Sequence, residues 1–425
     1  MTPPAPPEPR YASLLATAAI ESARAGAYAQ AEALAKLALA TEPANPELHY
    51  LLGHAQYRLS RYQDAEHALR RSILIDPNHA RANNDLAAAL FALGRDEDAI
   101  RHIRAALRLD PTLPEAEETE AIWLLRQGRF REAWPKYEAR YRTEKGQGLR
   151  RDFACPQWQG EPIAGRTILL HAEQGFGDAI QFARYVPLVA QRGARVILEV
   201  HRGLGRLMAG LTGAQLVLER GQTLPHADLH CPLLSLPLIF GTDLDSIPAS
   251  VPYLAAQDAL VFKWRAHLGP RRGLRIGVVW SGNPAHRDDR RRTIPLGRFA
   301  RLLAPRDGYE FHVLQAAVRQ DDKPVLASLP HVRDHSLLMP DFADTAALVS
   351  LMDVVISVDT SVAHLAGALG WPVWLLLPAM PDWRWMLGRD DSPWYPTFWL
   401  FRQRSPGDWD DVLGRVAQQL NTMLT

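Results

Sequence analysis

The chain has 425 residues, 47% of them apolar, which is enough for two or three domains with full cores. Its 48 Lys and Arg residues nearly balance 47 Asp and Glu residues, so no basic excess points to nucleic acid or an anionic membrane. The start, MTPPAPPEPR, lacks the features of a signal peptide, and no apolar run is long enough for a membrane helix. The two cysteines, Cys155 and Cys231, are far apart and have no metal-ligand neighbours. We expect a soluble cytoplasmic protein, with residues 1–10 as a disordered tail.

The first third of the chain repeats with a period of 34 residues. The pattern indicates pairs of amphipathic helices with alanine where two helices cross, glycine or serine at the turn between them, and proline before the next pair. A single pair cannot bury its apolar face, so several must stack. The positions that share the period are Pro43, Pro77 and Pro111; Ala31, Ala65, Ala99 and Ala133; Gly26, Ser60, Gly94 and Gly128; and Tyr28, Tyr62 and Phe130.

This pattern resembles the tetratricopeptide repeat, and we expect about four repeats over residues 11–145, forming an α-solenoid whose concave groove suits a peptide. The fourth repeat has Lys145 in place of proline and carries Trp123 and Trp134, so we expect it to pack on the following domain. An interpretation of the repeats as a spacer or a dimerisation surface, and with it a homodimer, stays open.

After a connector with Pro156, Trp158 and Gly160, short β-branched runs alternate with helical segments, which predicts an α/β fold. The pattern restarts near Leu274, so we expect two parallel-sheet halves, 146–254 and 255–425, with residues 247–258 as the linker. Ligands of such sheets bind beyond the carboxyl ends of the strands. The expected strands are 167–171, 195–200, 215–218, 228–231, 275–280, 310–314, 353–358 and 373–377, and helices are expected over 179–191 and 409–424.

The segment ISVDTSVAHLAGALG, residues 356–370, reads as a strand, a turn and a helix. Asp359 ends the strand, and Thr360 and Ser361 are natural N-cap residues. The free N–H groups of such a helix start suit a phosphate, and His364, one turn later, can face the same ligand. A well-capped core helix with a hydrogen-bonded His364 is the alternative, and the spacing does not decide between them.

A second strand opens into a loop in VVWSGNPAHRDDRRRTIPL, residues 278–296. Ser281, Gly282 and Asn283 could donate hydrogen bonds to a phosphate, and Arg292 is the candidate cation because its guanidinium can fork onto two oxygens. The alternative is a solvated loop with internal ion pairs. Its other charged residues are Arg287, Asp288, Asp289, Arg290 and Arg291.

Two further motifs carry chemistry. In HAEQGFGDAIQFARYVP a glycine turn is followed by Asp178, an acid that would repel a diphosphate but suits a neutral hydroxyl. In PDWRWMLGRDDSPWYP the aromatic rings, Trp383 first among them, could stack on a sugar or fill the seam between the halves. Neither a P-loop nor a dinucleotide fingerprint occurs, and no His, Cys or carboxylate cluster suggests a metal.

Together these four motifs resemble those of the bacterial tetratricopeptide-repeat glycosyltransferases, and the second part of the chain resembles glycosyltransferase family 9, the heptosyltransferases. The layout is also similar to O-GlcNAc transferases and flagellin glycosyltransferases. The resemblance implies a GT-B fold of two Rossmann-like halves and a metal-independent, inverting glycosyltransferase without a cofactor. Its partners would be a nucleotide-sugar donor and an acceptor protein bound through the repeats.

The resemblance also implies roles for single residues. Asp359, Thr360, Ser361 and His364 would contact the donor phosphates or sugar, although the family usually has glycine where Ser361 stands. Arg292 stands where a heptosyltransferase has a phosphate-binding lysine, and we assign Asp178 as the general base. Contacts to the sugar or acceptor are expected from Gln174, Gly177, Gln181 and Trp383.

Two alternatives to this function remain. One is a scaffold whose transferase half is inactive, and the other is a transferase acting on a surface glycan or lipid-linked acceptor.

Overall fold

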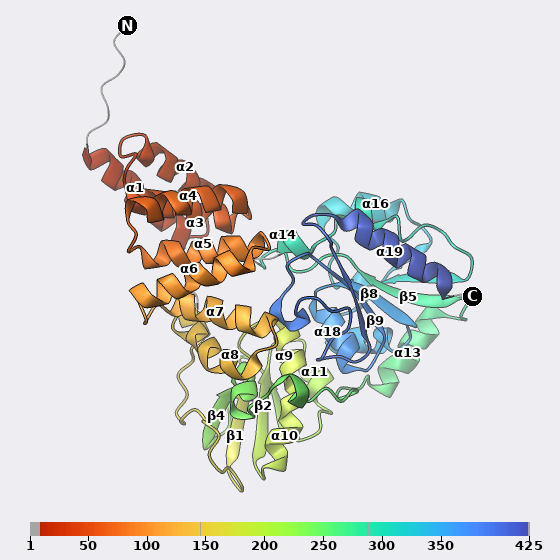
Figure 1. The fold of residues 1–425 in the computed structure, drawn as a ribbon. Helices are drawn as coiled ribbons and strands as arrows, with labels where there is room; N and C mark the ends of the chain where they lie inside the picture. The colour runs from red at the N-terminus through yellow and green to blue at the C-terminus, as the bar shows by residue number, and fades with distance from the viewer. Residues whose placement is uncertain (1–8, 145, 287–288, 424–425) are drawn as a thin grey trace. The chain divides into compact units, whose positions relative to one another are not determined.

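The computed structural model describes residues 9–144, 146–286 and 289–423 (Figure 1). It divides into two compact units, one made of residues up to Leu124 with Pro135–Gln147, the other of Leu125–Trp134 with Gly148–Thr425. Residues 1–8 of the expected tail and Lys145 lie outside the described residues. Residues 9 and 10, expected in the tail, begin the first helix. The segment Leu125–Trp134, expected in the repeat domain, belongs to the second unit.

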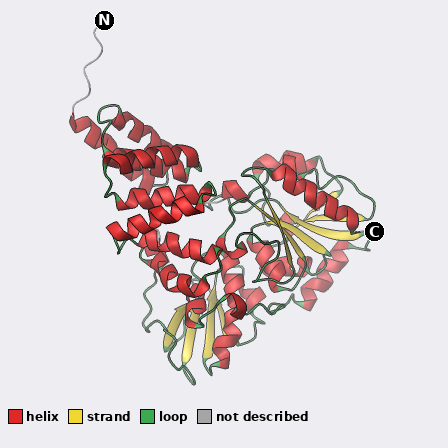
Figure 2. Ribbon diagram, in the orientation of Figure 1, coloured by secondary structure: helices red, strands yellow, loops and turns green. Residues whose placement is uncertain are grey.

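Helix pairs follow the 34-residue period from the first helix onward (Figure 2). The turn inside each pair has a residue with positive φ: Gly26 at 77°, Ser60 at 63°, Gly94 at 75° and Gly128 at 75°. Glycine adopts this conformation without steric cost, which explains the spacing read from the sequence. The pairs are α1 (Pro9–Arg24) with α2 (Tyr28–Leu39), α3 (Pro46–Arg58) with α4 (Tyr62–Ile75), α5 (Ala80–Ala92) with α6 (Asp96–Leu109), and α7 (Pro114–Arg126) with α8 (Phe130–Tyr137).

Ion pairs between successive repeats follow the same period. Arg61 donates to both oxygens of Glu32, at 2.7 and 2.9 Å, and Arg95 donates to Glu66 at 2.7 Å. Both links span 29 residues of sequence. They join the turn of one repeat to the second helix of the repeat before it.

The second unit contains two sheets whose strands all pair in parallel. The first has the order β3-β2-β1-β4 and the second the order β10-β9-β8-β5-β6-β7. The strands are β1 (Thr167–His171), β2 (Arg195–Val200), β3 (Ala214–Glu219), β4 (Leu229–Pro232), β5 (Leu274–Val279), β6 (Tyr309–Val313), β7 (Val332–Asp334), β8 (Val354–Val358), β9 (Val373–Leu377) and β10 (Phe398–Arg402).

The helices of this unit connect the strands. The helix expected over 179–191 begins earlier, at Phe176, and is interrupted by a 3-10 turn before Pro187. The helices of the unit are α9 (Phe176–Phe182), α10 (Val186–Gln191), α11 (Gly205–Met208), α12 (Leu236–Ile239), α13 (Asp258–Leu268), α14 (Asp289–Arg292), α15 (Leu296–Phe299), α16 (Lys323–Ala327), α17 (Phe342–Val349), α18 (Ser361–Ala368) and α19 (Trp409–Thr422). The last one packs on the second sheet, because Val412, Val416 and Leu420 share a core with Val278 and Ile356.

The strand order places two switch points in this unit. β1 lies between β2 and β4, and β5 lies between β6 and β8, so the chain crosses to the other side of the sheet at β1/β4 and at β5/β8. Loops that leave the carboxyl ends of neighbouring strands diverge there and open a crevice for a ligand. The fold is thus a helical repeat region followed by two Rossmann-like halves, the GT-B arrangement predicted from the sequence.

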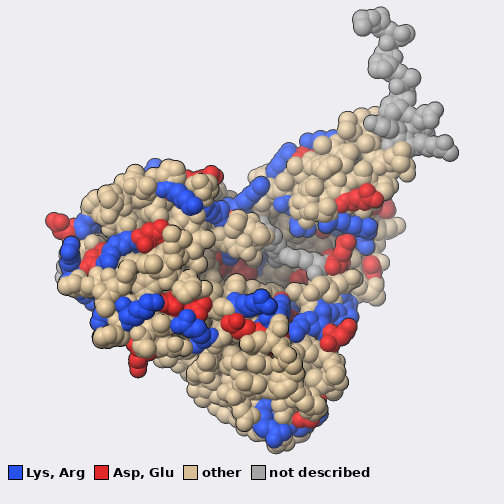
Figure 3. All heavy atoms as spheres, turned by 180° about the vertical axis from the view of Figure 1, so that it is seen from behind, with Lys and Arg blue, Asp and Glu red and all other residues tan. Residues whose placement is uncertain are grey.

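Charge is distributed evenly on the face seen in Figure 3, where basic and acidic side chains alternate over both units, in keeping with the net charge of +1. No helix of the described residues has both the length and the apolar character to cross a membrane.

Candidate functional site

The turn between β8 and α18 presents an uncapped helix start. Thr360, the N-cap residue, has extended backbone (φ −142°, ψ 168°) and its side chain makes no cap bond. Its hydroxyl is instead 3.1 Å from that of Ser357, three residues earlier in β8. Ser361 is half-buried and opens the helix. The N–H of Ala363 donates to the oxygen of Thr360 at 3.1 Å, so the N–H groups that could bind an anion are those before it, of Ser361 and Val362.

Asp359 and His364 lie beside each other below this turn. Their closest atoms, Asp359 Oδ1 and His364 Nε2, are 4.0 Å apart. Burial, and then repulsion from Asp382, raise the pKa of Asp359 to about 6. Burial, and then repulsion from Arg384, lower the pKa of His364 to about 3, so this histidine is neutral at physiological pH.

His364 is held inside the protein. Its Nδ1 lies 3.0 Å from the Tyr395 hydroxyl, and its ring stacks on Trp385 at a centroid distance of 5.3 Å. The side chain is only 6% exposed. This favours the alternative of a hydrogen-bonded core histidine over a direct phosphate contact.

The loop after β5 brings Arg292 to the same turn. Arg292 Nη1 donates to the backbone oxygen of Asp359 at 2.8 Å. A Cβ on Gly282 would lie 2.7 Å from Arg292 Nη2, so a side chain there would displace the guanidinium from its present place. Two segments predicted separately, 281–283 and 359–361, thus meet through Arg292.

Other predicted donors of this loop have partners within the protein. Ser281 is buried and its hydroxyl accepts from Gln315 Nε2 at 3.3 Å. The side-chain oxygen of Asn283 accepts from the N–H of Ala285 at 3.0 Å, within an exposed turn. Arg291 donates to the oxygen of Met380 at 2.8 Å. Arg287 and Asp288 lie outside the described residues.

Arg319 shapes this loop and was not found from the sequence. Its Nη2 donates to the oxygen of Gly282 at 3.1 Å, to Asp289 at 2.6 Å and to the Thr293 hydroxyl at 3.1 Å. It follows β6, so it joins the neighbouring strand's loop to that of β5. No motif marks it, because its partners lie at least 26 residues away.

The turn between β1 and α9 packs directly on α18. A Cβ on Gly177 would lie 2.8 Å from His364 Cδ2. Gly177 is therefore a point of close approach between the two halves of the second unit, and the absence of a side chain permits it. The sequence predicted this glycine as a ligand contact. In the structure its Cα faces the ring of His364.

Asp178 sits one residue further into α9. Its Oδ2 accepts from the N–H of Gly175 at 2.7 Å, which is the helix-capping role, and its Oδ1 accepts from Arg384. The side chain is 18% exposed. The carboxylate predicted as the general base thus forms an ion pair across the two halves of the unit.

Trp383 and Gln181, expected to contact sugar or acceptor, are enclosed. Gln181 is 0% exposed and its Oε1 accepts from Arg384. Trp383 is 3% exposed, and its ring lies 5.7 Å from that of Trp134 and 6.0 Å from that of Trp394. For Trp383 the structure favours the alternative interpretation, aromatic packing. Gln174, in the loop before α9, is half-buried.

Among the residues that the structure describes, no three His, Cys, Asp or Glu side chains are grouped so as to hold a metal ion. The expectation of a reaction without a metal stays a prediction.

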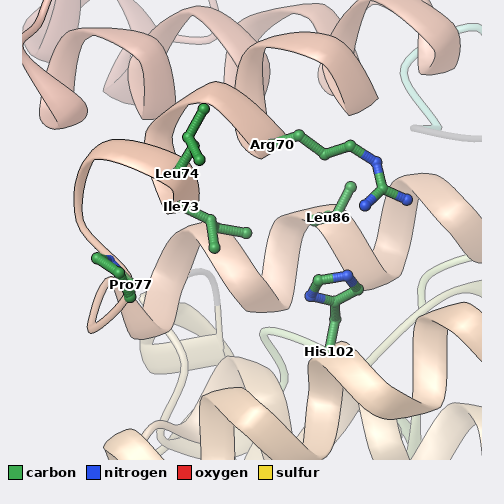
Figure 4. A pocket seen from close by; sticks show the side chains of 6 residues that line it. All are labelled: Arg70, Ile73, Leu74, Pro77, Leu86 and His102. Carbon is green, nitrogen blue, oxygen red and sulfur yellow. The ribbon is translucent and has the colours of Figure 1, made fainter.

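The repeat unit has a concave feature of its own (Figure 4). A pocket of about 310 Å³ lies among α4, α5 and α6 and contains none of the predicted site residues. Its walls are mainly apolar, with a guanidinium and an imidazole at the edge. The lining residues are Arg70, Ile73, Leu74, Pro77, Leu86 and His102.

Comparison with known proteins identifies the repeats. Two family models described as tetratricopeptide repeat match residues 22–74 and 50–114, which confirms the repeats predicted from the 34-residue period. The crystal structure of MamA is 20% identical and covers 33% of this chain and 82% of its own, with a TM-score of 0.28.

Two further proteins are similar to larger parts of the chain. Protein FlbA of Caulobacter vibrioides is 26% identical over 317 residues, which are 68% of this chain and 52% of FlbA, so the chain spans about half the length of this relative. The structure of a glycosyl transferase family 9 protein from Veillonella parvula is 11% identical and covers 63% of this chain and 99% of that one, with a TM-score of 0.49. The chain joins tetratricopeptide repeats to an α/β unit of two parallel sheets.

Proposed function

We propose that the second unit is a metal-independent, inverting glycosyltransferase that moves a sugar from a nucleotide-sugar to an acceptor hydroxyl. The observation that carries this proposal is the meeting of three separately predicted segments. Arg292, whose guanidinium lies against Gly282, reaches Asp359 at the start of α18, and Gly177 reaches His364 in the same helix. All three segments follow the carboxyl ends of switch-point strands, where α/β proteins bind nucleotides.

The donor diphosphate would lie at the start of α18. Its oxygens would accept from the N–H groups of Ser361 and Val362 and from the Ser361 hydroxyl. Arg292 would approach from the side and neutralise the charge that grows as the diphosphate departs. The neutral His364, in the same helix, would add no charge of its own.

Asp178 would act on the acceptor. The acceptor oxygen attacks the anomeric carbon while the hydroxyl proton passes to the Asp178 carboxylate. The bond between the anomeric carbon and the diphosphate oxygen breaks, and its electron pair leaves with the diphosphate. Because the displacement is a single step from the opposite face, the anomeric centre inverts.

The repeats would bind the acceptor as a polypeptide, with serine or threonine as the modified residue. Stacked repeats form extended concave surfaces suited to a chain in extended form. This part of the proposal rests on the repeats alone. A concave repeat surface favours a protein over a glycan as the acceptor.

The donor class can be tested by thermal unfolding and calorimetry with UDP-, GDP-, ADP- and CMP-sugars. We expect one class to raise the unfolding temperature, and Arg292→Ala to weaken its binding about 10- to 100-fold, as loss of a charged hydrogen bond does. Arg290→Ala, an exposed arginine of the same loop, is the matched control and should bind normally. Absence of stabilisation by every donor and nucleotide would contradict the proposal and favour a scaffold.

The acceptor class needs a separate experiment. Intact-mass analysis of candidate proteins after co-expression should reveal the mass of one added sugar. Transfer to a glycan or lipid-linked acceptor without any protein product would contradict the protein-acceptor part alone.

A further inference from the structure

We infer that Arg384 is the positioning residue of Asp178, an inference that rests on the proposed transferase function. Arg384 lies in the 3-10 turn η8 (Trp383–Trp385) of the second half and directs each of its three nitrogens to a different side chain. Nη2 donates to Asp178 Oδ1, Nε to Gln181 Oε1 at 2.6 Å, and Nη1 to Asp382 Oδ1 at 2.9 Å. Two of these partners belong to α9, in the other half of the unit.

Arg384 is buried, and burial strengthens its electrostatic interaction with Asp178. Arg384 is 7% exposed, and its guanidinium lies over the Trp383 ring at 4.3 Å. A buried cation is stable only when it is paired and hydrogen-bonded, and Asp178 and Asp382 supply two carboxylates for it. Burial alone would raise the pKa of Asp382, but the charge and hydrogen bonds of Arg384 outweigh burial and lower it.

The two carboxylates that accept from Arg384 have different roles. Asp382 lies two residues before Arg384 and is the N-cap of the same turn, so it holds the guanidinium in place. Asp178 comes from the other half and is gripped at both oxygens, by Arg384 and by the Gly175 N–H. Each carboxylate oxygen can accept a second hydrogen bond, so the grip orients Asp178 and leaves it able to take a proton.

Other ionisable groups face this site from neighbouring elements. Asp382 lies in the same turn as Arg384, Asp359 and His364 lie at the start of α18, and His201 follows β2. Cations act on these groups as well: Arg126 on Asp382, Arg292 on Asp359 and Arg220 on His201. Arg384 is the cation that forms the ion pair with Asp178 itself.

Two substitutions separate charge from geometry. Arg384→Gln removes the cation and keeps an amide donor, whereas Arg384→Lys keeps the charge and loses the fork. Arg389→Gln is the matched control, because Arg389 also pairs with an acid two residues away, Asp391, at the exposed end of the same loop. The readout is kcat/KM against pH, with the donor found in the thermal-unfolding screen.

The expected result is specific to positioning. Arg384→Gln should lower kcat/KM about 100-fold and move the acidic limb of its pH profile up by about 1–2 pH units. Arg384→Lys should lower kcat/KM about tenfold and leave the limb in place. Arg389→Gln should change neither. A slower Arg384→Gln enzyme whose acidic limb has not moved would overturn the inference and show a merely structural role.

A second measurement keeps the inference testable without turnover. Carbodiimide labels protonated carboxyl groups, and peptide mass analysis reports the labelling of Asp178 between about pH 4 and pH 8. Labelling should begin at higher pH in Arg384→Gln than in the native chain. If the native chain turns over no donor, the proposed function fails, whereas unchanged labelling of Asp178 fails the inference alone.

Folding of the charge-removing variant is checked by thermal unfolding. Should Arg384→Gln fail to fold, Arg384→Lys supplies both readouts, and its limb and labelling must then match the native chain. Equal upward shifts in Arg384→Lys and in any folded Arg384→Gln sample would overturn the inference, because the retained charge would then have no effect.

Discussion

The second unit contains two strand–turn–helix segments that look alike and carry opposite electrostatics. The turn after β1 leads into α9, whose first turn contains Asp178, and this carboxylate accepts from the N–H of Gly175. The turn after β8 leads into α18, whose first turn has no acidic residue and whose N-cap side chain makes no cap bond. A helix start becomes an anion site only when its own sequence leaves the N–H groups open.

The two turns also touch each other. Gly177 packs on His364, and Arg384 joins Asp178 to the loop that follows β9. The acid-bearing turn and the uncapped turn are therefore held in a fixed relation within one unit. We propose that this relation sets the acceptor hydroxyl and the donor diphosphate on opposite sides of the anomeric carbon.

The largest effect should come from removing the acid of the first turn. Asp178→Asn keeps the shape and can keep the bond to the Gly175 N–H with its single oxygen, but it loses the ion pair with Arg384 and cannot take a proton, so transfer should fall about 10²- to 10⁴-fold. Donor binding should be nearly unchanged, since the diphosphate lies at the other turn. Measurement of kcat and of donor affinity checks both, and a fully active variant would contradict the assignment of the base.

Much of the fold follows from the sequence alone. The strands Thr167–His171 and Arg195–Val200 were predicted to the residue, because a buried parallel strand reads as a short apolar run between turn signals. Val332–Asp334 was missed, since a strand of three residues is too short to show an alternation of apolar and polar side chains. Phe398–Arg402 was missed because its aromatic run follows an aromatic loop and merges with it.

The site was predictable only in part, for a physical reason. A strand end and an N-cap are local features, so the turn at Asp359 and the acid at Asp178 could be read from spacing. Arg384 acts on Gln181 and Asp178 over 203 and 206 residues of sequence, and no local pattern records such a pair. Trp383 shows the reverse problem, since an aromatic residue does not reveal which neighbours cover its ring.

The next largest effect should come from giving the second turn the charge of the first. Ser361→Asp places an acid in the first turn of α18, where it should repel a diphosphate and weaken donor binding by about tenfold or more. The same acid should stabilise the helix by about 0.3–1 kcal/mol. Calorimetry and thermal unfolding should thus move in opposite directions.

Ser361→Ala is the control for this swap. It removes one hydroxyl and adds no charge, so donor binding should weaken less than in Ser361→Asp and the unfolding temperature should change little. Donor binding that survives Ser361→Asp would contradict the placement of the diphosphate at α18.

A smaller effect is expected at the contact between the turns. Gly177→Ala puts a methyl group 2.8 Å from the buried His364 ring, which Tyr395 and Trp385 hold in place, so we expect a loss of about 1–3 kcal/mol in unfolding free energy. Gly414→Ala, in α19 with open space around it, should instead stabilise by about 0.5–1 kcal/mol. Denaturant unfolding of both variants checks the sign, and equal effects would contradict close packing at Gly177.

The smallest effect concerns the acid that the second turn does retain. The pKa of Asp359 in the folded state is about 6, raised first by burial and then by Asp382, whereas the unfolded chain has the ordinary value of 3.8. Between these values the folded state binds more protons than the unfolded state, so stability falls as pH rises, and the full cost is present above about pH 6.

Asp359→Asn should therefore stabilise the protein near neutral pH by about 1–2 kcal/mol and have little effect near pH 4, since the pKa of about 6 already includes the attraction from Arg292. Thermal unfolding at several pH values measures this difference between native and variant chains. A variant less stable than the native chain at neutral pH would show that the attraction of Asp359 for Arg292 exceeds its burial cost. Both turns would then need an ionised acid. They would differ only in where that acid lies, inside the helix for Asp178 and before the N-cap for Asp359.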